Sequence, residues 1–180
     1  EEDAATNGPT AEPIARVLPS GAPVLVKQVF GADANPEIDT AVRRHRRGSV
    51  VLVGLETDVC LAHSAIGWRT AGLRVVVVHD AVYSAGAGHV NGLARLRAEG
   101  VELLSAKELY YEWLRDLPTV RAFDAAHPEL RIDDRTLIAA HAAGPDRVVD
   151  RVCVRADRGA DLVVGSHVPV VQLARRIAAV

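Results

Sequence analysis

Hydrophobic and polar positions follow two patterns that alternate along residues 23–116. Short apolar runs rich in β-branched residues are typical of strands covered on both faces, and they occupy 23–29, 50–55, 74–79 and 101–104. Mixed runs with helical spacing occupy 36–47, 60–71, 89–99 and 107–116. Glycines at 48, 72 and 100 stand where three of these helices should end. The alternation predicts right-handed βαβ units, and therefore an α/β fold in three layers with a mostly parallel sheet.

Both ends of the chain depart from this alternation. Residues 1 to about 20 lack periodicity and predict an irregular lead-in. Beyond Pro118 the sequence predicts a short helix at 120–127, then a break at 127–134. The remainder predicts helices at 135–143 and 146–158, a strand at 161–164 and a closing helix to Val180. We therefore predict a main domain at 1–130 and a C-terminal extension at 131–180, which is either one more α/β unit or a ligand-binding appendage around 165–167.

Composition and charge describe an ordinary soluble protein. The 180 residues are 49% hydrophobic, carry a formal charge of −2, and suffice for one domain with a real core. Basic residues are interspersed with acidic ones, and the one cluster, 43–47, is interpreted as a solvated helix end. No apolar run approaches membrane-spanning length and no signal peptide is visible. With only two cysteines, these features favour a cytoplasmic protein without nucleic-acid or membrane partners.

Lysine is rare in this chain, which directs attention to Lys27. Lys27 and Lys107 are the only two lysines, whereas arginine is abundant. A desolvated lysine can lose its proton and act as acid or base, but arginine stays charged. Lys27 ends a predicted strand and is therefore a candidate for proton transfer, the alternative being a surface lysine beside a strand.

Cys60 stands at a predicted junction between a buried strand and a helix. Unpaired N–H groups and the helix dipole favour the thiolate there, and the thiolate is the reactive form of cysteine. The alternative interpretation is a buried cysteine that acts as a small hydrophobic residue.

The segment Gly54-Leu-Glu-Thr-Asp-Val-Cys60 resembles the nucleophile signature of isochorismatase-like cysteine hydrolases. The resemblance continues in Pro23-Val-Leu-Val-Lys27-Gln-Val-Phe30-Gly-Ala32 and in the strands that start after Gly72 and Gly100, and covers about residues 15 to 130. It implies the α/β/α fold, a small-molecule substrate and no cofactor. Family members commonly form dimers or tetramers, so a homo-oligomer is expected, with the helix 107–113 as a subunit contact or a core helix.

The resemblance also implies roles for four residues. Cys60 would attack a carbonyl or imine carbon and form a covalent intermediate that water releases, with Lys27 assisting proton transfer. The backbone N–H groups of Glu56 and Cys60 would form the oxyanion hole, around a cis peptide that maps to Leu55–Glu56. Phe30 would line the substrate pocket, or belong to the core. Hydrolysis of a small amide is the preferred reaction, and vinyl-ether cleavage is the second choice.

The chain departs from the family at its catalytic aspartate, which ends a first strand several tens of residues before the lysine. The only aspartate before Lys27 is Asp3, and no strand pattern surrounds it. Together with the absence of methionine, even at position 1, this predicts either a fragment of a longer protein or a degenerate member lacking the first strand or strands. The alternative function is therefore a non-catalytic assembly or regulatory module. No metal is assigned, because the metal-binding positions of some family members belong to the same missing region.

Two aspartates have structural interpretations, and one histidine is kept as an alternative partner of Cys60. Asp58 is interpreted as a support for its loop, since a carboxylate so close would raise the pKa of the thiol. Asp80 is interpreted as a cap or turn residue. His63, one helical turn beyond Cys60, is kept as a fallback partner in a Cys–His pair.

Two motifs are set aside. The glycines at 86, 88 and 92 imitate a dinucleotide fingerprint, but the acidic residue precedes them instead of following. Cys60, His63 and His89 together match no zinc-ligand spacing.

Overall fold

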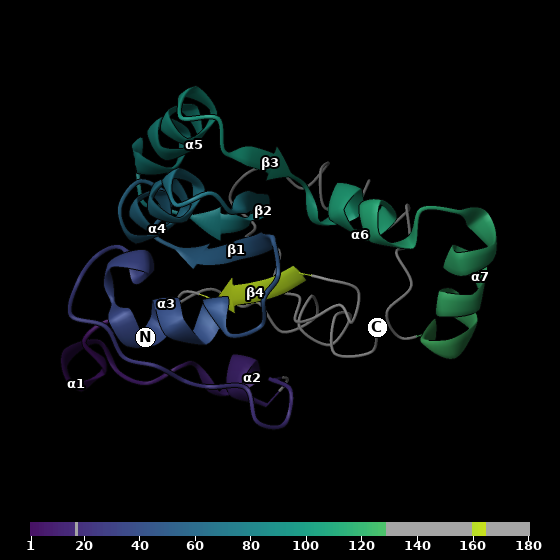
Figure 1. The fold of residues 1–180 in the computed structure, drawn as a ribbon, viewed down its shortest axis with the longest axis horizontal. Helices are drawn as coiled ribbons and strands as arrows, with labels where there is room; N and C mark the ends of the chain where they lie inside the picture. Colours follow the sequence, from purple (N-terminus) through teal and green to yellow (C-terminus); the bar gives the residue numbers. More distant parts are fainter. Residues whose placement is uncertain (17, 129–159, 165–180) are drawn as a thin grey trace.

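A four-stranded parallel sheet forms the centre of the protein (Figure 1), in a computed structural model that describes residues 1–16, 18–128 and 160–164. The strands are β1 (Ser49–Leu55), β2 (Arg74–Tyr83), β3 (Glu102–Leu104) and β4 (Ala160–Val164). Their order across the sheet is β3-β2-β1-β4, and Val51 of β1 pairs with Val76 on one side and Leu162 on the other. The predicted α/β fold with a parallel sheet is confirmed, as is the predicted strand at 161–164.

Helices connect the strands at the predicted places. They are α3 (Pro36–Arg43), α4 (Cys60–Thr70), α5 (Gly88–Ala98), α6 (Ala106–Leu114) and α7 (Leu117–Ala126). The lead-in contains two short helices, α1 (Ala4–Asn7) and α2 (Glu12–Ala15), and a 3₁₀ turn η1 (Ala32–Ala34) precedes α3. The lead-in is therefore less irregular than predicted. Helix α3 is shorter than predicted, because the chain turns after Arg44 and Arg46 adopts a left-handed conformation with φ of 52°.

Local side-chain caps explain where two of these helices begin. The Asn35 side chain accepts from the N–H groups of Glu37 and Ile38, at 3.0 and 3.1 Å, ahead of α3. Ser105 and Glu108 form a reciprocal capping box at the start of α6. These caps satisfy N–H groups that have no partner inside the helix.

The predicted strand at 23–29 is wrong. This segment makes one isolated bridge, between Glu2 and Lys27, and belongs to no strand. Val24 and Val26 are 52% and 45% exposed. The edge of β1 with which the segment would have to pair is occupied by β4.

The core lies between the sheet and the helices α3, α4 and α5. Alternate strand residues Val50, Leu52, Val75 and Val77 belong to one buried cluster with Ile38 of α3, Trp68 of α4 and Leu96 of α5. Fully burying a side chain of this kind contributes about 1.5–3 kcal/mol. Helix α6 contacts β2 and β3, and α6 and α7 share a smaller cluster around Phe123. The core thus fixes β1 and α4, and with them the turn that carries Cys60.

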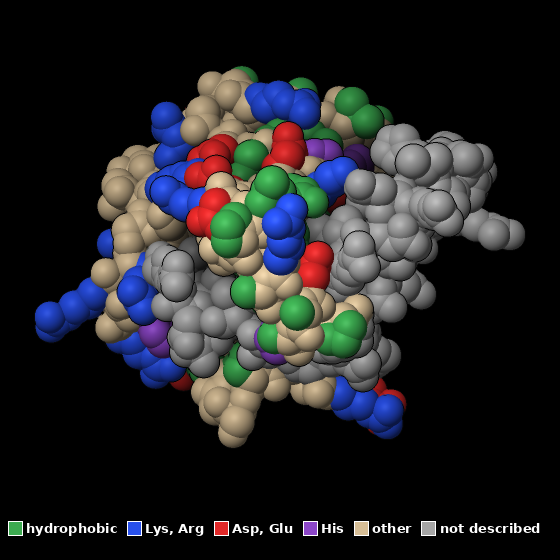
Figure 2. Space-filling view, turned by 90° about the vertical axis from the view of Figure 1, so that its right-hand side faces the viewer, with side chains coloured by type: hydrophobic (Ala, Val, Ile, Leu, Met, Phe, Trp, Pro, Cys, Tyr) green, Lys and Arg blue, Asp and Glu red, His purple; other side chains and the backbone are tan. Residues whose placement is uncertain are grey.

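The surface carries no large field of one charge on the side shown in Figure 2, where acidic and basic side chains alternate with hydrophobic ones on the described residues. Among the described helices, none combines the length and apolar character needed to cross a membrane. The helices predicted at 135–143 and 146–158, the predicted closing helix to Val180 and the appendage around 165–167 lie outside the described residues.

Candidate functional site

The site is built on the turn between β1 and α4, at the carboxyl edge of the sheet. Open α/β folds place their ligand sites at this edge. Strand β1 ends at Leu55, and Cys60 is the first residue of α4. The peptide bond between Leu55 and Glu56 is cis, as the sequence resemblance implied. We call residues 56–59 the nucleophile turn.

A carboxylate that the sequence analysis did not identify lies against Cys60. The thiol Sγ donates to Oε2 of Glu2 at 2.7 Å. The Nζ of Lys27 forms an ion pair with the same oxygen and also donates to the carbonyl of Val29 at 2.9 Å. The Lys27 side chain is 11% exposed and that of Glu2 is 31% exposed, so the ion pair is shielded from bulk water. The structure thus brings together two predicted residues, Cys60 and Lys27, around one oxygen of Glu2.

Main-chain hydrogen bonds hold Glu2 in this place. Residues 1–3 run parallel to residues 25–27: the nitrogen of Lys27 donates to the carbonyl of Glu1 at 2.8 Å, and that of Asp3 donates to the carbonyl of Lys27 at 3.1 Å. Glu2 and Lys27 are therefore bridge partners. The available signal in the sequence was the acidic run at 1–3, but it lacks the strand pattern that was sought, and an aspartate was expected in place of a glutamate.

The charges at this site keep the proton on sulfur. Burial and the hydrogen bond to Glu2 raise the pKa of Cys60 to about 11, and the charge of Lys27 offsets only part of this rise. The expectation of a thiolate favoured by the helix N-terminus is therefore wrong. Burial alone would raise the pKa of Glu2, but the hydrogen bonds from Cys60 and Lys27 outweigh it and lower that pKa. At neutral pH the site holds a thiol beside a carboxylate.

Two backbone donors at the nucleophile turn are available to a ligand. The N–H of Thr57 donates to the carbonyl of Tyr83 at 3.1 Å, and that of Val59 donates to the carbonyl of Glu56 at 3.2 Å. By contrast, the N–H groups of Glu56 and Cys60 have no acceptor among the described residues. These are the two amides assigned to the oxyanion hole from the sequence. Such unpaired donors beside a nucleophile can stabilise negative charge on a substrate oxygen.

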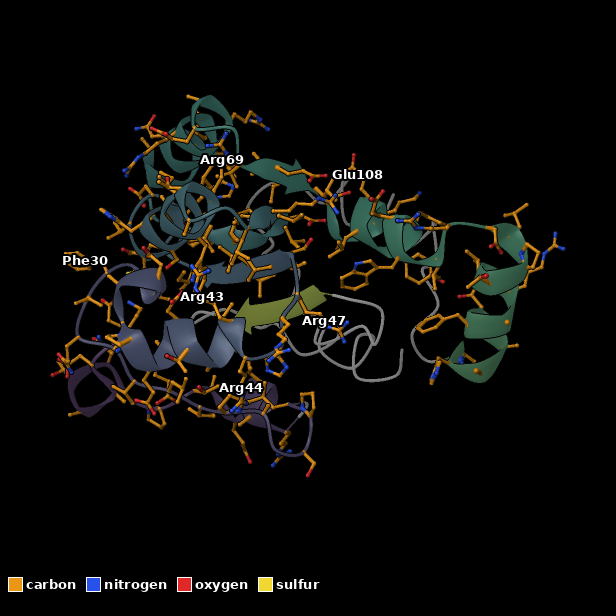
Figure 3. The ribbon with its side chains drawn as sticks, in the orientation of Figure 1. Phe30, Arg43, Arg44, Arg47, Arg69 and Glu108 are labelled. Carbon is orange, nitrogen blue, oxygen red and sulfur yellow. The ribbon has the colours of Figure 1, made fainter. Side chains whose placement is uncertain are left out.

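Phe30 and His63 form an aromatic pair near the start of α4. Phe30 is 59% exposed and projects away from the body of the protein (Figure 3). Its ring centroid lies 6.3 Å from that of His63. Phe30 is thus a surface residue and does not belong to the core. Cys60 donates to Glu2 and not to His63, so the fallback Cys–His pair is not formed.

Asp58 and Asp80 have the structural contacts that were expected. Asp58 accepts from the hydroxyl of Ser84 at 2.6 Å, and Asp80 accepts from the N–H of Ala106 at 2.8 Å, at the start of α6. In the described part of the chain, no three His, Cys, Asp or Glu side chains are grouped as a metal site would require.

The basic cluster at 43–47 does not converge on one point. Arg43 donates through Nε to both oxygens of Asp39, at 2.9 and 2.8 Å. Arg43, Arg44 and Arg47 point in different directions (Figure 3). This arrangement agrees with a solvated helix end.

Comparison with known proteins identifies the family. The sequence pattern of the isochorismatase domain matches residues 2–108, more than half of the chain, and the chain belongs to this family. It is 29% identical over 120 residues to isochorismatase domain-containing protein 2A of Mus musculus, an alignment that covers 66% of this chain and 48% of the mouse protein. The chain thus spans about half the length of this curated relative.

A solved structure has the same fold. The YcaC gene product of Escherichia coli, described as an octameric hydrolase of unknown specificity, superposes with a TM-score of 0.60 at 21% identity, over 79% of this chain and 71% of that one. A pyrazinamidase/nicotinamidase from Streptococcus mutans is 30% identical over 44% of this chain and 45% of that one, with a TM-score of 0.42.

Proposed function

We propose that this protein is a cysteine-dependent hydrolase that cleaves the C–N bond of a small amide through a covalent intermediate on Cys60. The observation that carries the proposal is the convergence of the Cys60 thiol and the Lys27 ammonium on one carboxylate oxygen of Glu2. The amides of Glu56 and Cys60 lie at the two ends of the adjoining turn.

The reaction begins when Sγ attacks the amide carbon and its proton passes to Oε2 of Glu2. The carbonyl electron pair moves onto oxygen, where the N–H groups of Glu56 and Cys60 stabilise the charge. Collapse breaks the C–N bond, the leaving amine takes the proton from Glu2, and a thioester remains. Water then attacks the thioester, Glu2 accepts its proton, and the second collapse releases the acid and returns the proton to Sγ.

Glu2 and Lys27 have different parts in this scheme. A thiol with a raised pKa needs a base within hydrogen-bonding distance, and Glu2 is already in place at 2.7 Å. Lys27 fixes the carboxylate and favours its ionised form. Arginine at this position would keep the charge, but its planar fork could not reproduce the single contact that Nζ makes with Oε2.

The substrate is proposed to be a small uncharged amide, with Phe30 beside it as an aromatic wall. The name of the Streptococcus mutans relative suggests nicotinamide and pyrazinamide as first candidates. Cleavage of a vinyl ether is the second choice. We further propose a cytoplasmic homo-oligomer that needs no cofactor, with residues 131–180 as a C-terminal extension whose strand β4 pairs with β1 in the central sheet.

The test is ammonia release from nicotinamide, pyrazinamide, benzamide and acetamide by the full-length natural protein. Cys60→Ala should abolish release, and Glu2→Gln and Lys27→Gln should each lower kcat by about 100-fold or more, the usual contribution of a proton-transfer group. Cys153→Ala is the matched control and should keep the activity. Amide hydrolysis that survives Cys60→Ala would contradict the proposal.

One observation favours the second candidate, a non-catalytic module: the pKa of about 11 makes Cys60 a poor nucleophile on its own. The rate at which iodoacetamide alkylates Cys60 in the presence of an amide distinguishes the two candidate functions. In the hydrolase, an amide substrate protects Cys60 from alkylation by iodoacetamide while it is turned over. In the module, no amide of the panel is hydrolysed and none changes the alkylation rate.

A further inference from the structure

We propose that the hydrogen bond between Thr57 and His89 positions the nucleophile turn, so that these two residues are positioning residues for the oxyanion hole. The inference rests on the proposed function, because it assigns a task to the amides of Glu56 and Cys60. The thiol of Cys60 donates to Glu2, whereas Thr57 and His89 are hydrogen-bonded to each other.

Thr57 is the buried anchor of the turn. Its side chain is fully buried, and its Oγ1 lies 3.1 Å from Nδ1 of His89, in the first turn of α5. A buried hydroxyl without a partner is costly, so this contact is strongly favoured. Thr57 follows Glu56 directly, so its buried side chain anchors the peptide group next to the cis Leu55–Glu56 peptide, which carries the N–H of Glu56.

His89 also contacts Tyr83, a residue that binds the nucleophile turn. Its ring stacks on Tyr83, with centroids 6.1 Å apart and planes at 28°, and the carbonyl of Tyr83 accepts from the N–H of Thr57 at 3.1 Å. Burial, with a smaller contribution from the charge of His79, lowers the pKa of His89. The ring is therefore neutral at neutral pH, where one nitrogen can donate and the other can accept.

Helix α5 supports the same turn at its backbone. A Cβ on Gly92 would lie 2.7 Å from the nitrogen of Asp58 and 2.8 Å from the carbonyl carbon of Thr57. A Cβ on Gly88 would lie 2.6 Å from Oδ2 of Asp58, whose other carboxylate oxygen, Oδ1, accepts from the hydroxyl of Ser84. Gly88 and Gly92, two of the three glycines that imitate a dinucleotide fingerprint, thus allow α5 to approach the turn closely, and the Thr57–His89 bond adds the directional contact.

The position of the turn matters because the N–H donors of an oxyanion hole stabilise the transition state only when they lie within hydrogen-bonding distance of the substrate oxygen. A displacement of about 1 Å can cost about 100-fold in rate. Alkylation of Cys60 by iodoacetamide develops no oxyanion, since sulfur displaces iodide from a saturated carbon. A positioning role therefore predicts that amide hydrolysis and alkylation respond differently to the same substitution.

The experiment compares Thr57→Val and His89→Phe in the full-length protein. Each should lower kcat for amide hydrolysis by about 10- to 100-fold, with KM changed by less than about 3-fold, because the loss is confined to the transition state. The alkylation rate at the Cys60 peptide should stay within about 2-fold of wild type. Thr40→Val and His45→Phe, both at exposed positions of α3 and the turn after it, are the matched controls.

Conservative variants keep the test informative if the first pair folds poorly. His89→Asn places a polar atom near the position of Nδ1 and should restore most of the kcat. His89→Gln places its polar atoms near Nε2 and should not. Thr57→Ser keeps the hydroxyl and should remain close to wild type.

A readout without turnover separates this inference from the proposed function. Benzaldehyde adds reversibly to a thiol, forming a C–S bond while the thiol proton moves to oxygen, and that oxygen would occupy the oxyanion position. Benzaldehyde should protect wild-type Cys60 from iodoacetamide, and about 10-fold more should be needed in Thr57→Val and His89→Phe, as expected for one weakened hydrogen-bonding site.

The outcomes are distinct. If wild type hydrolyses no amide but its benzaldehyde protection weakens in both variants, the proposed function fails and the positioning role stands. If wild type hydrolyses amides and both variants keep its kcat, the positioning role is overturned. It is also overturned if alkylation falls in parallel with kcat, since that would reflect general damage to the site, or if wild type shows neither turnover nor protection.

Discussion

Glu2 connects the two residues that define the site. Its Oε2 accepts from the thiol of Cys60 and pairs with the ammonium of Lys27. The carboxylate raises the pKa of the thiol, and the thiol and the lysine together lower the pKa of the carboxylate. The proton therefore stays on sulfur until an electrophile approaches.

This arrangement predicts opposite effects on thiol reactivity and on catalysis. Glu2→Gln removes the negative charge that raises the pKa of Cys60, while Lys27 still lowers it, so the pKa should fall below about 11. A lower pKa means more thiolate at pH 8, so alkylation by iodoacetamide should be faster by about 10-fold for each unit of pKa change. Amide hydrolysis should nevertheless fall.

Lys27→Gln is the matched opposite change. It removes the charge that lowers the pKa of Cys60, so alkylation at pH 8 should become slower. The measurement is the pH profile of Cys60 alkylation from about pH 7 to about pH 11 for wild type and both variants. A Glu2→Gln profile that coincides with wild type, or shifts to higher pH, would show that Glu2 does not govern the thiol.

At the same scale, sequence reasoning identified Cys60 and Lys27 but not Glu2. Cys60 follows a buried strand, and Lys27 is a rare lysine in a recognisable segment, so both carry local signals. Glu2 acquires its place only through main-chain bonds to residues 25–27, which leave no mark in the hydrophobic pattern. The prediction of a thiolate failed because burial and a carboxylate outweigh the partial charge at a helix N-terminus.

At the scale of secondary-structure elements, the strands and helices that build the core were predictable and the segment at 23–29 was not. Strand β1 and helix α4 have apolar residues at the spacing that burial requires, and both appear within about one residue of their predicted bounds. The run at 23–29 is also rich in β-branched apolar residues, but β4 takes the pairing edge of β1. Pairing between strands distant in sequence decides such cases, and local composition does not encode it.

The close approach of α5 to the nucleophile turn gives a prediction for Gly92→Ala. The added methyl group would meet backbone atoms of Thr57 and Asp58 at 2.7 to 2.9 Å, and backbone cannot move aside as a side chain can. We expect a loss of about 1–3 kcal/mol in the free energy of unfolding, as is usual for overpacking, and a lower kcat.

Gly48→Ala is the control for this substitution. A Cβ on Gly48 would meet no atom within 4 Å, and its backbone has no left-handed φ, so the substitution should change stability by less than about 1 kcal/mol. Urea denaturation measures both variants. If Gly92→Ala were as stable as wild type, the backbone of the nucleophile turn would be able to move away from the added methyl group, and the prediction would be wrong.

At the scale of the whole molecule, the parallel sheet and its family were predictable from the alternation of elements and the motif around Cys60. The order of the strands was not, because β4 comes from residues 160–164 and pairs with β1 across more than half of the sequence. The division of the chain at residue 130 remains a prediction.

The expected homo-oligomer is also tested at this scale. On α6, Leu109 and Leu114 are buried whereas Tyr111 is exposed, so one face of this helix belongs to the core and the other is open to a subunit contact. Sedimentation equilibrium of the full-length protein should give a mass of two or more copies, and Tyr111→Glu should lower it. A single-copy mass for wild type would contradict the expected oligomer.

The most direct test of the proposed chemistry is to trap the intermediate on Cys60. Full-length protein is mixed with an amide substrate found in the panel, quenched in acid within the first turnover, and digested for peptide mass spectrometry. We predict that the acyl group of the substrate is bound to the Cys60 peptide, and that Cys60→Ser carries no thioester. Ammonia release with no acyl group on Cys60, or with the group on another residue, would contradict the role of Cys60 as the nucleophile.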